Sequence, residues 1–346
     1  MIVALAVTAA AVSAPGSRPL AADAYWTAGG RLVTFWDGSR QLWMMKADGT
    51  HSRPVAPYWV AGSGEASTSP SGRLVAISAV YGRRAVRGQL VVRRPGAKRS
   101  TARFRLGRLP TDGLGEPAWA PAEDALAVEV YLYGATERSH IFVAGRKTGV
   151  KDISAASSSR DEESPAWSPN GREIAFLSCA KTGRTGCDVV VTARDGSHRR
   201  AVLRNVEPQR FSSASQPAWA PSGRMIALVL REKFANPEKP QSYLLHTIRL
   251  RASKARLIAT TAVTDPFWIP IAWSPDGRRL AFSDPSGLWS VDVATGRKQL
   301  LTELGRDPRM WTGKAVSWTP SRRILFTYGG DIYTMLPGRA PTRIPG

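Results

Sequence analysis

The sequence contains few of the residues on which several common protein classes depend. Of its 346 residues, only two are cysteine and four are histidine. Two cysteines exclude a cysteine-rich disulfide scaffold and a four-cysteine zinc site, and so few histidines argue against a histidine-rich metal centre. No stretch beyond the N-terminal segment reaches the roughly 18 apolar residues that a transmembrane helix needs. A long amphipathic helical period is also missing, which excludes an α/β fold.

Acidic residues and lysine are scarce as well. The chain has 48 Lys and Arg against 27 Asp and Glu, a net charge of +21, and only 10 of the 48 are Lys. Usage rich in Arg and poor in Lys is typical of GC-rich genomes, so a solvated basic surface explains the charge without a nucleic-acid partner. We therefore expect no nucleic-acid function, and a specific anionic partner is the alternative.

The positive charge is unevenly distributed. Between Ala66 and Thr111 there is no Asp or Glu, and 11 residues are basic. Arg83, Arg84 and Arg87 lie close together in this stretch and could dock an anionic polymer. Charge that protects a sheet edge from aggregation explains the stretch equally well.

The N-terminus predicts export. Residues 2–12 are apolar apart from Thr8, a run of about 11 residues that is too short to span a bilayer and fits a signal-peptide core. No Lys or Arg precedes this run, although signal peptides usually have one there. Small residues end at Ala14 and at Ala22. We therefore predict a signal peptide in residues 1–22, cleaved after Ala14 or Ala22, and a periplasmic, cell-surface or secreted protein.

The rest of the chain repeats a Trp-x-Pro motif. It reads AWAP, AWSP, AWAP, AWSP and SWTP, with a weaker STSP copy before them. The motif prolines are Pro70, Pro121, Pro169, Pro221, Pro275 and Pro320, spaced 51, 48, 52, 54 and 45 residues apart. Trp26 marks a degenerate first copy, because it stands six residues before Leu32 as Trp318 stands six before Ile324. The recurring Trp residues are expected in the core.

Each unit has the same internal order. A segment ending in Trp is followed by a turn such as Ser274-Pro275-Asp276-Gly277, in which proline fixes φ and glycine accepts a positive φ. An apolar run, a variable loop, a third strand, a tight Asp-Gly turn and a short fourth strand complete the unit. Four short strands in about 45–50 residues predict an all-β propeller blade.

Residues 165–176 and 271–282 resemble the P-x-W-S-P-D-G-x-x-[IL]-A-[FY] motif of TolB-like, WD40-like β-propeller repeats. Asn170 and Ile271 depart from it. The resemblance implies a closed ring, usually of six blades. The first unit has Trp26 and the last looks complete, so we expect seven blades in a single domain over residues 23–346, with six as the alternative. TolB carries an α/β domain before its propeller, for which we expect no counterpart, so a Tol-system role does not follow. We expect a monomer.

The loops that lead into the innermost strands carry acidic residues. Glu65, Glu116 and Gln216 lie five residues before a motif proline, and Glu163 lies six before. These side chains are expected to ring the mouth of the central channel, where they would attract a cation or a basic peptide, and oxygen ligands suit Ca²⁺ or Mg²⁺. Capping of strand ends and pairing with arginines explain them equally. We assign no cofactor, and a divalent cation at the mouth remains an alternative.

The same loops carry large aromatic residues. Trp59, Phe211, Trp268 and Trp311 lie between predicted strands. Aromatic side chains on a polar face are good anchors for a protein partner, although they could equally fold back over the blades.

Cys179 and Cys187 stand at the ends of two predicted hairpin strands, so we expect a disulfide, with two free thiols as the alternative. The chain lacks a G-x-S-x-G nucleophile elbow and an H-E-x-x-H zinc motif. These observations favour a non-catalytic, exported propeller that binds a protein or ligand in the cell envelope. The alternatives are a metal-dependent lyase or lactonase at the channel mouth, and an anionic-polymer binder.

Overall fold

The computed structural model describes fourteen stretches of the chain: residues 21–37, 41–56, 65–81, 87–106, 111–132, 138–154, 160–180, 186–206, 216–231, 241–251, 254–263, 269–284, 286–304 and 316–345. None of the helices in these stretches is long and apolar enough to cross a membrane.

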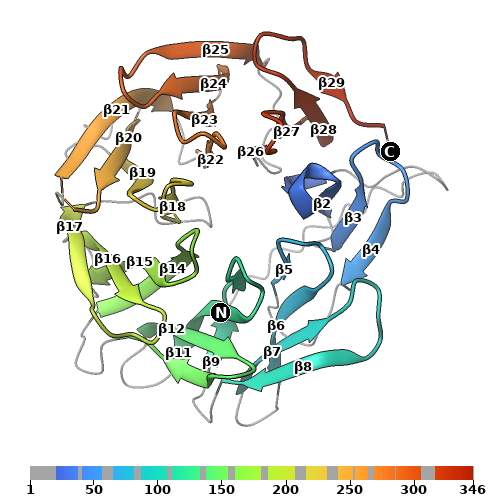
Figure 1. Cartoon of the computed structure of the whole chain (residues 1–346), viewed down its shortest axis with the longest axis vertical. Coiled ribbons are helices and arrows are strands. Elements are labelled where there is room, and N and C mark those ends of the chain that lie inside the picture. The colour runs from blue at the N-terminus through green and yellow to red at the C-terminus, as the bar shows by residue number, and fades with distance from the viewer. Residues whose placement is uncertain are drawn as a thin grey trace, which may run out of the picture.

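The chain folds into a ring of seven antiparallel sheets, one sheet for each sequence repeat (Figure 1). Each sheet is formed by consecutive strands, with the first strand of each blade innermost and the last outermost. The expected seven-bladed β-propeller is confirmed, and the alternative of six blades is wrong because the first and last units each complete a sheet of their own.

The first three blades cover the N-terminal half of the ring. Blade 1 contains β1 (Ala21–Thr27), the short 3-10 helix η1 (Ala28–Gly30), β2 (Leu32–Asp37), β3 (Leu42–Lys46) and β4 (Arg53–Ala56). Blade 2 contains β5 (Ala66–Thr68), β6 (Val75–Tyr81), β7 (Arg87–Arg93) and β8 (Ser100–Arg105). Blade 3 contains β9 (Thr111–Leu114), β10 (Ala118–Trp119), β11 (Ala125–Leu132), β12 (Arg138–Gly145) and β13 (Gly149–Asp152).

The remaining four blades complete the ring. Blade 4 contains β14 (Arg160–Trp167), β15 (Glu173–Ala180), β16 (Cys187–Ala193) and β17 (Arg200–Val206). Blade 5 contains β18 (Ala218–Trp219), β19 (Met225–Arg231), β20 (Gln241–Arg249) and β21 (Lys254–Val263). Blade 6 contains β22 (Ile271–Trp273), β23 (Arg279–Asp284), β24 (Gly287–Asp292) and β25 (Lys298–Glu303). Blade 7 contains β26 (Val316–Trp318), β27 (Ile324–Tyr328), β28 (Asp331–Met335) and β29 (Thr342–Arg343).

The repeated turn between the first two strands of a blade is built by its own side chains. In blade 6, the Gly277 N–H donates to the Ser274 carbonyl at 2.8 Å, and the Ser274 hydroxyl donates to Asp276 Oδ1 at 2.6 Å. Gly277 has a φ of 68°, a left-handed conformation that glycine adopts without strain. Asp276 therefore acts as a turn former, as its place in the repeat predicts.

The motif tryptophans connect neighbouring blades. In blades 3 to 6, the indole N–H donates to the backbone carbonyl just before the equivalent position of the preceding blade. The four bonds run from Trp119 to Ser67 (3.3 Å), from Trp167 to Ala118 (3.0 Å), from Trp219 to Ala166 (3.1 Å) and from Trp273 to Ala218 (2.9 Å). This ladder explains why the sequence repeats a tryptophan rather than another large apolar residue.

The tryptophans are not uniformly core residues, although their register predicts it. Trp167 and Trp273 are buried, whereas Trp119, Trp219 and Trp318 are only half-buried. Trp119, for example, lines an open pocket between blades 2 and 3, so one side of its ring is not covered.

The ring closes between blade 1 and blade 7, and each of these blades keeps its own four strands. β1 packs beside β27, and a shared cluster joins Phe35 of blade 1 to Leu325 and Ile332 of blade 7. The Ala21 N–H donates to the Gly330 carbonyl at 2.8 Å, and the Trp26 backbone N–H donates to the Ser317 hydroxyl at 3.0 Å. Within the described residues, the buried indole nitrogens of Trp318 in blade 7 and Trp26 in blade 1 have no hydrogen-bond partner, so the ladder ends at blade 6.

Candidate functional site

A buried carboxyl group in blade 3 marks the candidate site. Glu129 lies on β11, an otherwise apolar strand, and only 8% of the residue is exposed. The Ser164 backbone N–H of the neighbouring blade donates to its Oε2 at 3.0 Å, and the nearby Tyr131 and Ser139 side chains favour its charged form. Burial, opposed by the Ser164 bond and assisted by the negative charge of Glu163, raises the pKa of Glu129 to about 7.

Tyr131 connects this carboxyl to acidic residues of the two flanking blades. It lies two residues beyond Glu129 on the same strand, so both side chains point to one face of the sheet. Burial first, and then the fields of Glu129, Glu65 and Glu163, raise the pKa of the Tyr131 phenol above its ordinary value. Glu65, Glu129 and Glu163, from blades 2, 3 and 4, therefore all act on Tyr131, and these four residues are here called the acidic cluster.

Strand register shows which of the three blades carries an acid on its second strand at this level. Ala76, Ala127 and Ala175 pair with the innermost strands of blades 2, 3 and 4 at Ser67, Ala118 and Ala166. Two residues further along, the second strands carry Ser78, Glu129 and Leu177, so only blade 3 has an acid there. Gly115 lies opposite Glu129 and donates its N–H to the Glu129 carbonyl at 2.9 Å, which leaves this carboxyl without a bulky facing side chain.

The sequence predicts Glu163 in a loop, but the structure places it in a strand. β14 begins at Arg160, with an irregularity between Glu163 and Ala166. Ser164 adopts a φ of 58° there, a left-handed conformation unusual for serine. The break turns the Ser164 N–H toward Glu129, so the acidic loop becomes part of the innermost strand and builds the cluster.

A second buried carboxyl lies beside the cluster. Glu162 has a fully buried side chain, and its Oε1 accepts bonds from Arg199 Nη2 at 2.7 Å and from the Ser178 hydroxyl at 3.1 Å. Arg199 also stacks over the Phe176 ring at 4.9 Å. Burial raises the pKa of Glu162, and the Arg199 charge opposes that shift. Because the two charges of this pair within blade 4 cancel, Glu162 is not part of the acidic cluster.

The predicted ring of acidic residues is only partly assembled into the cluster. Glu65 stands exposed just before β5 and Glu163 is half-buried on β14, and both act on Tyr131. Glu116 and Gln216 are half-buried just before β10 and β18, at the corresponding ends of their blades. Glu129 is the residue that sequence reasoning misses, although a lone Glu within the apolar run Ala125–Leu132 was a signal.

Other predicted site residues are not placed by the structure. Trp59, Phe211, Trp268, Trp311, Arg83 and Arg84 lie outside the described residues. Arg87 is exposed at the start of β7. Within the described part of the basic stretch, Arg103 and Arg105 point outward from β8, whose residues alternate between half-buried and exposed. Binding of an anionic polymer to blade 2 stays a prediction.

The structure contains the Cys179–Cys187 disulfide. The two residues pair directly across β15 and β16, with Cα atoms 4.0 Å apart. Glu163 Oε2 lies 4.0 Å from Cys179 Sγ, so the disulfide lies beside the cluster. Among the described residues, no three His, Cys, Asp or Glu side chains are grouped so that they could hold a metal ion. The acidic cluster is therefore a region of negative field, and it does not form a tight set of metal ligands.

Comparison with known proteins supports the fold and does not identify a family. No protein-family model and no curated protein matches the chain. An oligogalacturonate lyase in complex with manganese aligns with a TM-score of 0.57 at 14% identity, over 90% of this chain and 86% of that one. The oligogalacturonate lyase of Vibrio parahaemolyticus aligns with a TM-score of 0.58 at 13% identity, over 90% and 87%. A putative TolB from Agrobacterium tumefaciens gives a TM-score of 0.47 at 18% identity, over 75% and 87%. At such identities the likeness shows the propeller fold alone.

Proposed function

We propose that the protein is an exported, non-catalytic propeller that binds a cationic group of a partner, such as a lysine or arginine side chain, at the acidic cluster. The observation that carries this proposal is the convergence of Glu65, Glu129 and Glu163 from three successive blades around Tyr131. Partly buried carboxylates that lie near one another favour a cation more than exposed ones do, because water screens them less.

Two features support export. The apolar run of residues 2–12 fits a signal peptide. The Cys179–Cys187 disulfide fits a protein that matures in an oxidising compartment, since such bonds are rare in the reducing cytosol. The proposed place of action is therefore the cell envelope or its exterior.

The test uses trilysine and triglutamate peptides in calorimetric titrations at low and moderate salt. Trilysine is expected to bind despite the net charge of +21, because the local field at the cluster is negative. Glu129→Gln and Glu65→Gln should each weaken binding by roughly threefold to tenfold. Glu303→Gln, an exposed acid on the outer strand β25, removes the same charge elsewhere and should change the affinity less than twofold.

The pH dependence gives a second readout. Glu129 has a pKa of about 7 and faces Glu163 and the neutral phenol of Tyr131, on which Glu65 also acts. Raising the pH from 6 to 8 ionises Glu129, so trilysine should bind more tightly at pH 8, and this gain should disappear in Glu129→Gln. Equal affinity for trilysine and triglutamate, or a gain with pH that persists in Glu129→Gln, would exclude the proposal.

An enzyme that uses the same residues is the second candidate. A buried carboxyl with a pKa near 7 beside a tyrosine is suited to proton transfer. The two lyases similar in fold act, by their names, on oligogalacturonate. That substrate carries many carboxylates, which the acidic cluster would repel, so we rank this candidate second. Formation of unsaturated products from oligogalacturonate, measured with and without Mn²⁺ and lost in Glu129→Gln, would reverse the ranking.

A further inference from the structure

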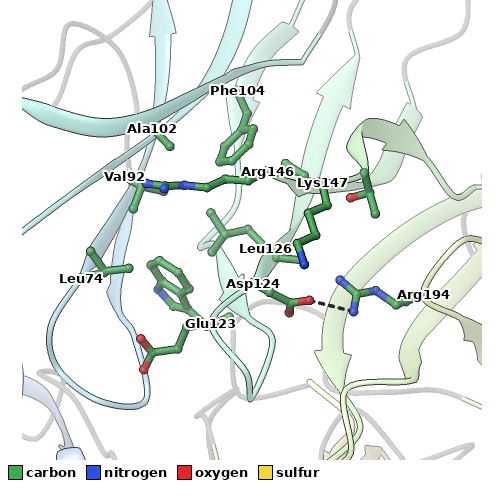
Figure 2. Close-up of a pocket in the computed structure, with 14 residues that line it drawn as sticks. Leu74, Val92, Ala102, Phe104, Glu123, Asp124, Leu126, Arg146, Lys147 and Arg194 are labelled. Atoms are coloured by element: carbon green, nitrogen blue, oxygen red, sulfur yellow. Dashed lines mark hydrogen bonds and ion pairs between the residues drawn. The ribbon is translucent and has the colours of Figure 1, made fainter.

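A pocket of about 660 Å³ opens between blades 2 and 3, in the size range of small-molecule sites (Figure 2). Its wall is apolar and includes Leu74, Phe104, Trp119 and Leu126. It lies at the end of the blades that carries the Trp-x-Pro turns, since its rim residues Glu123 and Asp124 come from the β10–β11 turn and residues 146–148 form the β12–β13 turn. The acidic cluster lies toward the opposite ends of the same strands.

Small side chains keep this space open. Ala102 on β8 and Ala125 and Ala144 of blade 3 line it, where larger residues would fill the gap between Phe104 and Trp119. β8 alternates along its length, so Ala102 and Phe104 turn toward the pocket while Arg103 and Arg105 are exposed on the other face. The outermost strand of blade 3, β13, has only four residues and leaves the wall of blade 2 partly uncovered.

The charges at the rim favour an anion. Glu123 accepts bonds from the Ser71 N–H and hydroxyl, the latter at 2.9 Å, and keeps its charge, whereas Asp124 pairs with Arg194 at 3.0 Å. The lining cations Arg146, Lys147 and Arg194 outnumber these two acids, so the rim is positive overall. Arg146 donates to the uncharged Thr101 carbonyl at 3.0 Å across the two blades, so its charge is not neutralised by that bond. Among the described residues, no carboxylate forms an ion pair with the exposed Lys147.

We propose that this pocket binds a free medium-chain fatty carboxylate, with the acyl chain against Phe104 and Trp119 and the carboxylate at Arg146 and Lys147. The apolar wall removes methylene groups from water, and the two cations at the rim match a single anionic head. This site is separate from the acidic cluster and does not depend on the proposed function.

The experiment titrates octanoate, decanoate and dodecanoate, all below their micelle concentrations, into the full-length protein by calorimetry. Each added CH₂ group should tighten binding by about threefold to fourfold until the pocket is full. Dodecyltrimethylammonium, which has the same tail and the opposite charge, should bind at least about tenfold more weakly than dodecanoate. Affinity that is independent of chain length, or equal affinity for the cation, would overturn the proposal.

Variants locate the binding. Lys147→Glu should weaken decanoate binding by roughly tenfold, whereas Arg105→Glu, which makes the same charge change on the outward face of β8, should change it less than twofold. Ala102→Phe should fill the pocket and abolish binding while the melting temperature shows that the protein is folded. If Ala102→Phe fails to fold, the charge pair still decides the matter. Equal losses in the two charge variants, or binding only to phosphatidylglycerol vesicles, would refute the site.

Discussion

The indole N–H of Trp167 donates to the backbone carbonyl of Ala118 at 3.0 Å and so joins blade 4 to blade 3. The same bond recurs between successive blades from blade 2 to blade 6, whereas within the described part of the chain the indole nitrogens of Trp318 in blade 7 and Trp26 in blade 1 have no partner. The tryptophan that recurs in the repeats therefore helps to hold neighbouring blades together.

This ladder predicts that the same substitution of two motif tryptophans lowers stability by different amounts. Trp167→Phe keeps most of the apolar volume but removes the donor, so it should destabilise the protein by roughly 1–2 kcal/mol. Trp318→Phe should cost less, because none of the described residues accepts a hydrogen bond from its indole nitrogen. Urea unfolding midpoints of the two variants measure the difference. Equal losses would mean that ring volume, and not the N–H, explains the repeated tryptophan.

Glu129 predicts an unusual pH dependence of stability. Its pKa is about 7 in the folded protein and close to 4.5 in the unfolded chain. Between pH 4.5 and pH 7, the folded protein therefore holds a proton on Glu129 that the unfolded chain releases. Stability should therefore fall as the pH rises from about 4.5 to above 7, by up to roughly 3 kcal/mol from this group. Glu129→Gln should unfold at nearly the same urea concentration as the native protein at pH 5, and at a higher one at pH 8. A native midpoint that rises from pH 5 to pH 8 relative to the variant contradicts the assignment.

The Glu162–Arg199 pair predicts a large loss of stability when Arg199 alone is replaced. Arg199→Met leaves a fully buried carboxylate without its cation and should cost roughly 3–5 kcal/mol near neutral pH. The deficit should shrink as the pH falls, because protonation of Glu162 removes the buried charge. The double variant Glu162→Gln with Arg199→Met should recover much of the loss. Arg204→Met, whose side chain is 76% exposed and lies 3.6 Å from Asp188, serves as the control and should cost about 1 kcal/mol or less.

The disulfide predicts both reactivity and stability. Native protein should not react with a thiol reagent, and reduction should expose two thiols. Replacing Cys179 and Cys187 by serine should lower the free energy of unfolding by roughly 1–3 kcal/mol, because the closed loop is short. Mass spectrometry before and after reduction checks the bond, and two reactive thiols in protein purified without reductant would show that it does not form.

Strand β1 predicts which signal-peptide site is used if the protein is exported. Ala21 is fully buried, pairs with Asp37, and donates its N–H to Gly330 at the ring junction. Cleavage after Ala22 would remove this residue and weaken the closure between blades 1 and 7. We therefore expect processing after Ala14, which N-terminal sequencing of exported protein can test. A mature chain that begins at Asp23 would contradict this expectation.

The repeat motif was sufficient to predict the propeller, the seven blades and the turn chemistry of residues such as Asp276. Those features depend on short-range patterns: strand alternation, turn residues and the spacing of Trp and Pro. The pairing of Cys179 with Cys187 was also readable, because both cysteines belong to one hairpin. Glu129 was not recognised, since its pKa depends on Ser164 and Glu163 from the next blade and on burial that no local pattern reports.

The sequence alone determined the architecture, because each blade is a local unit whose strands are consecutive in the chain. The tertiary structure decided what depends on contacts between blades. It brought Glu65, Glu129 and Glu163 near Tyr131, left the pocket between Phe104 and Trp119 open, and ended the tryptophan ladder at blade 6. The scarcity of cysteine and histidine argued against a cysteine-rich disulfide scaffold and against cysteine-based or histidine-rich metal sites. The surroundings of residues such as Glu129 and Glu163 follow from the assembled blades, because electrostatic interactions and burial depend on distances in space and not on separation along the chain.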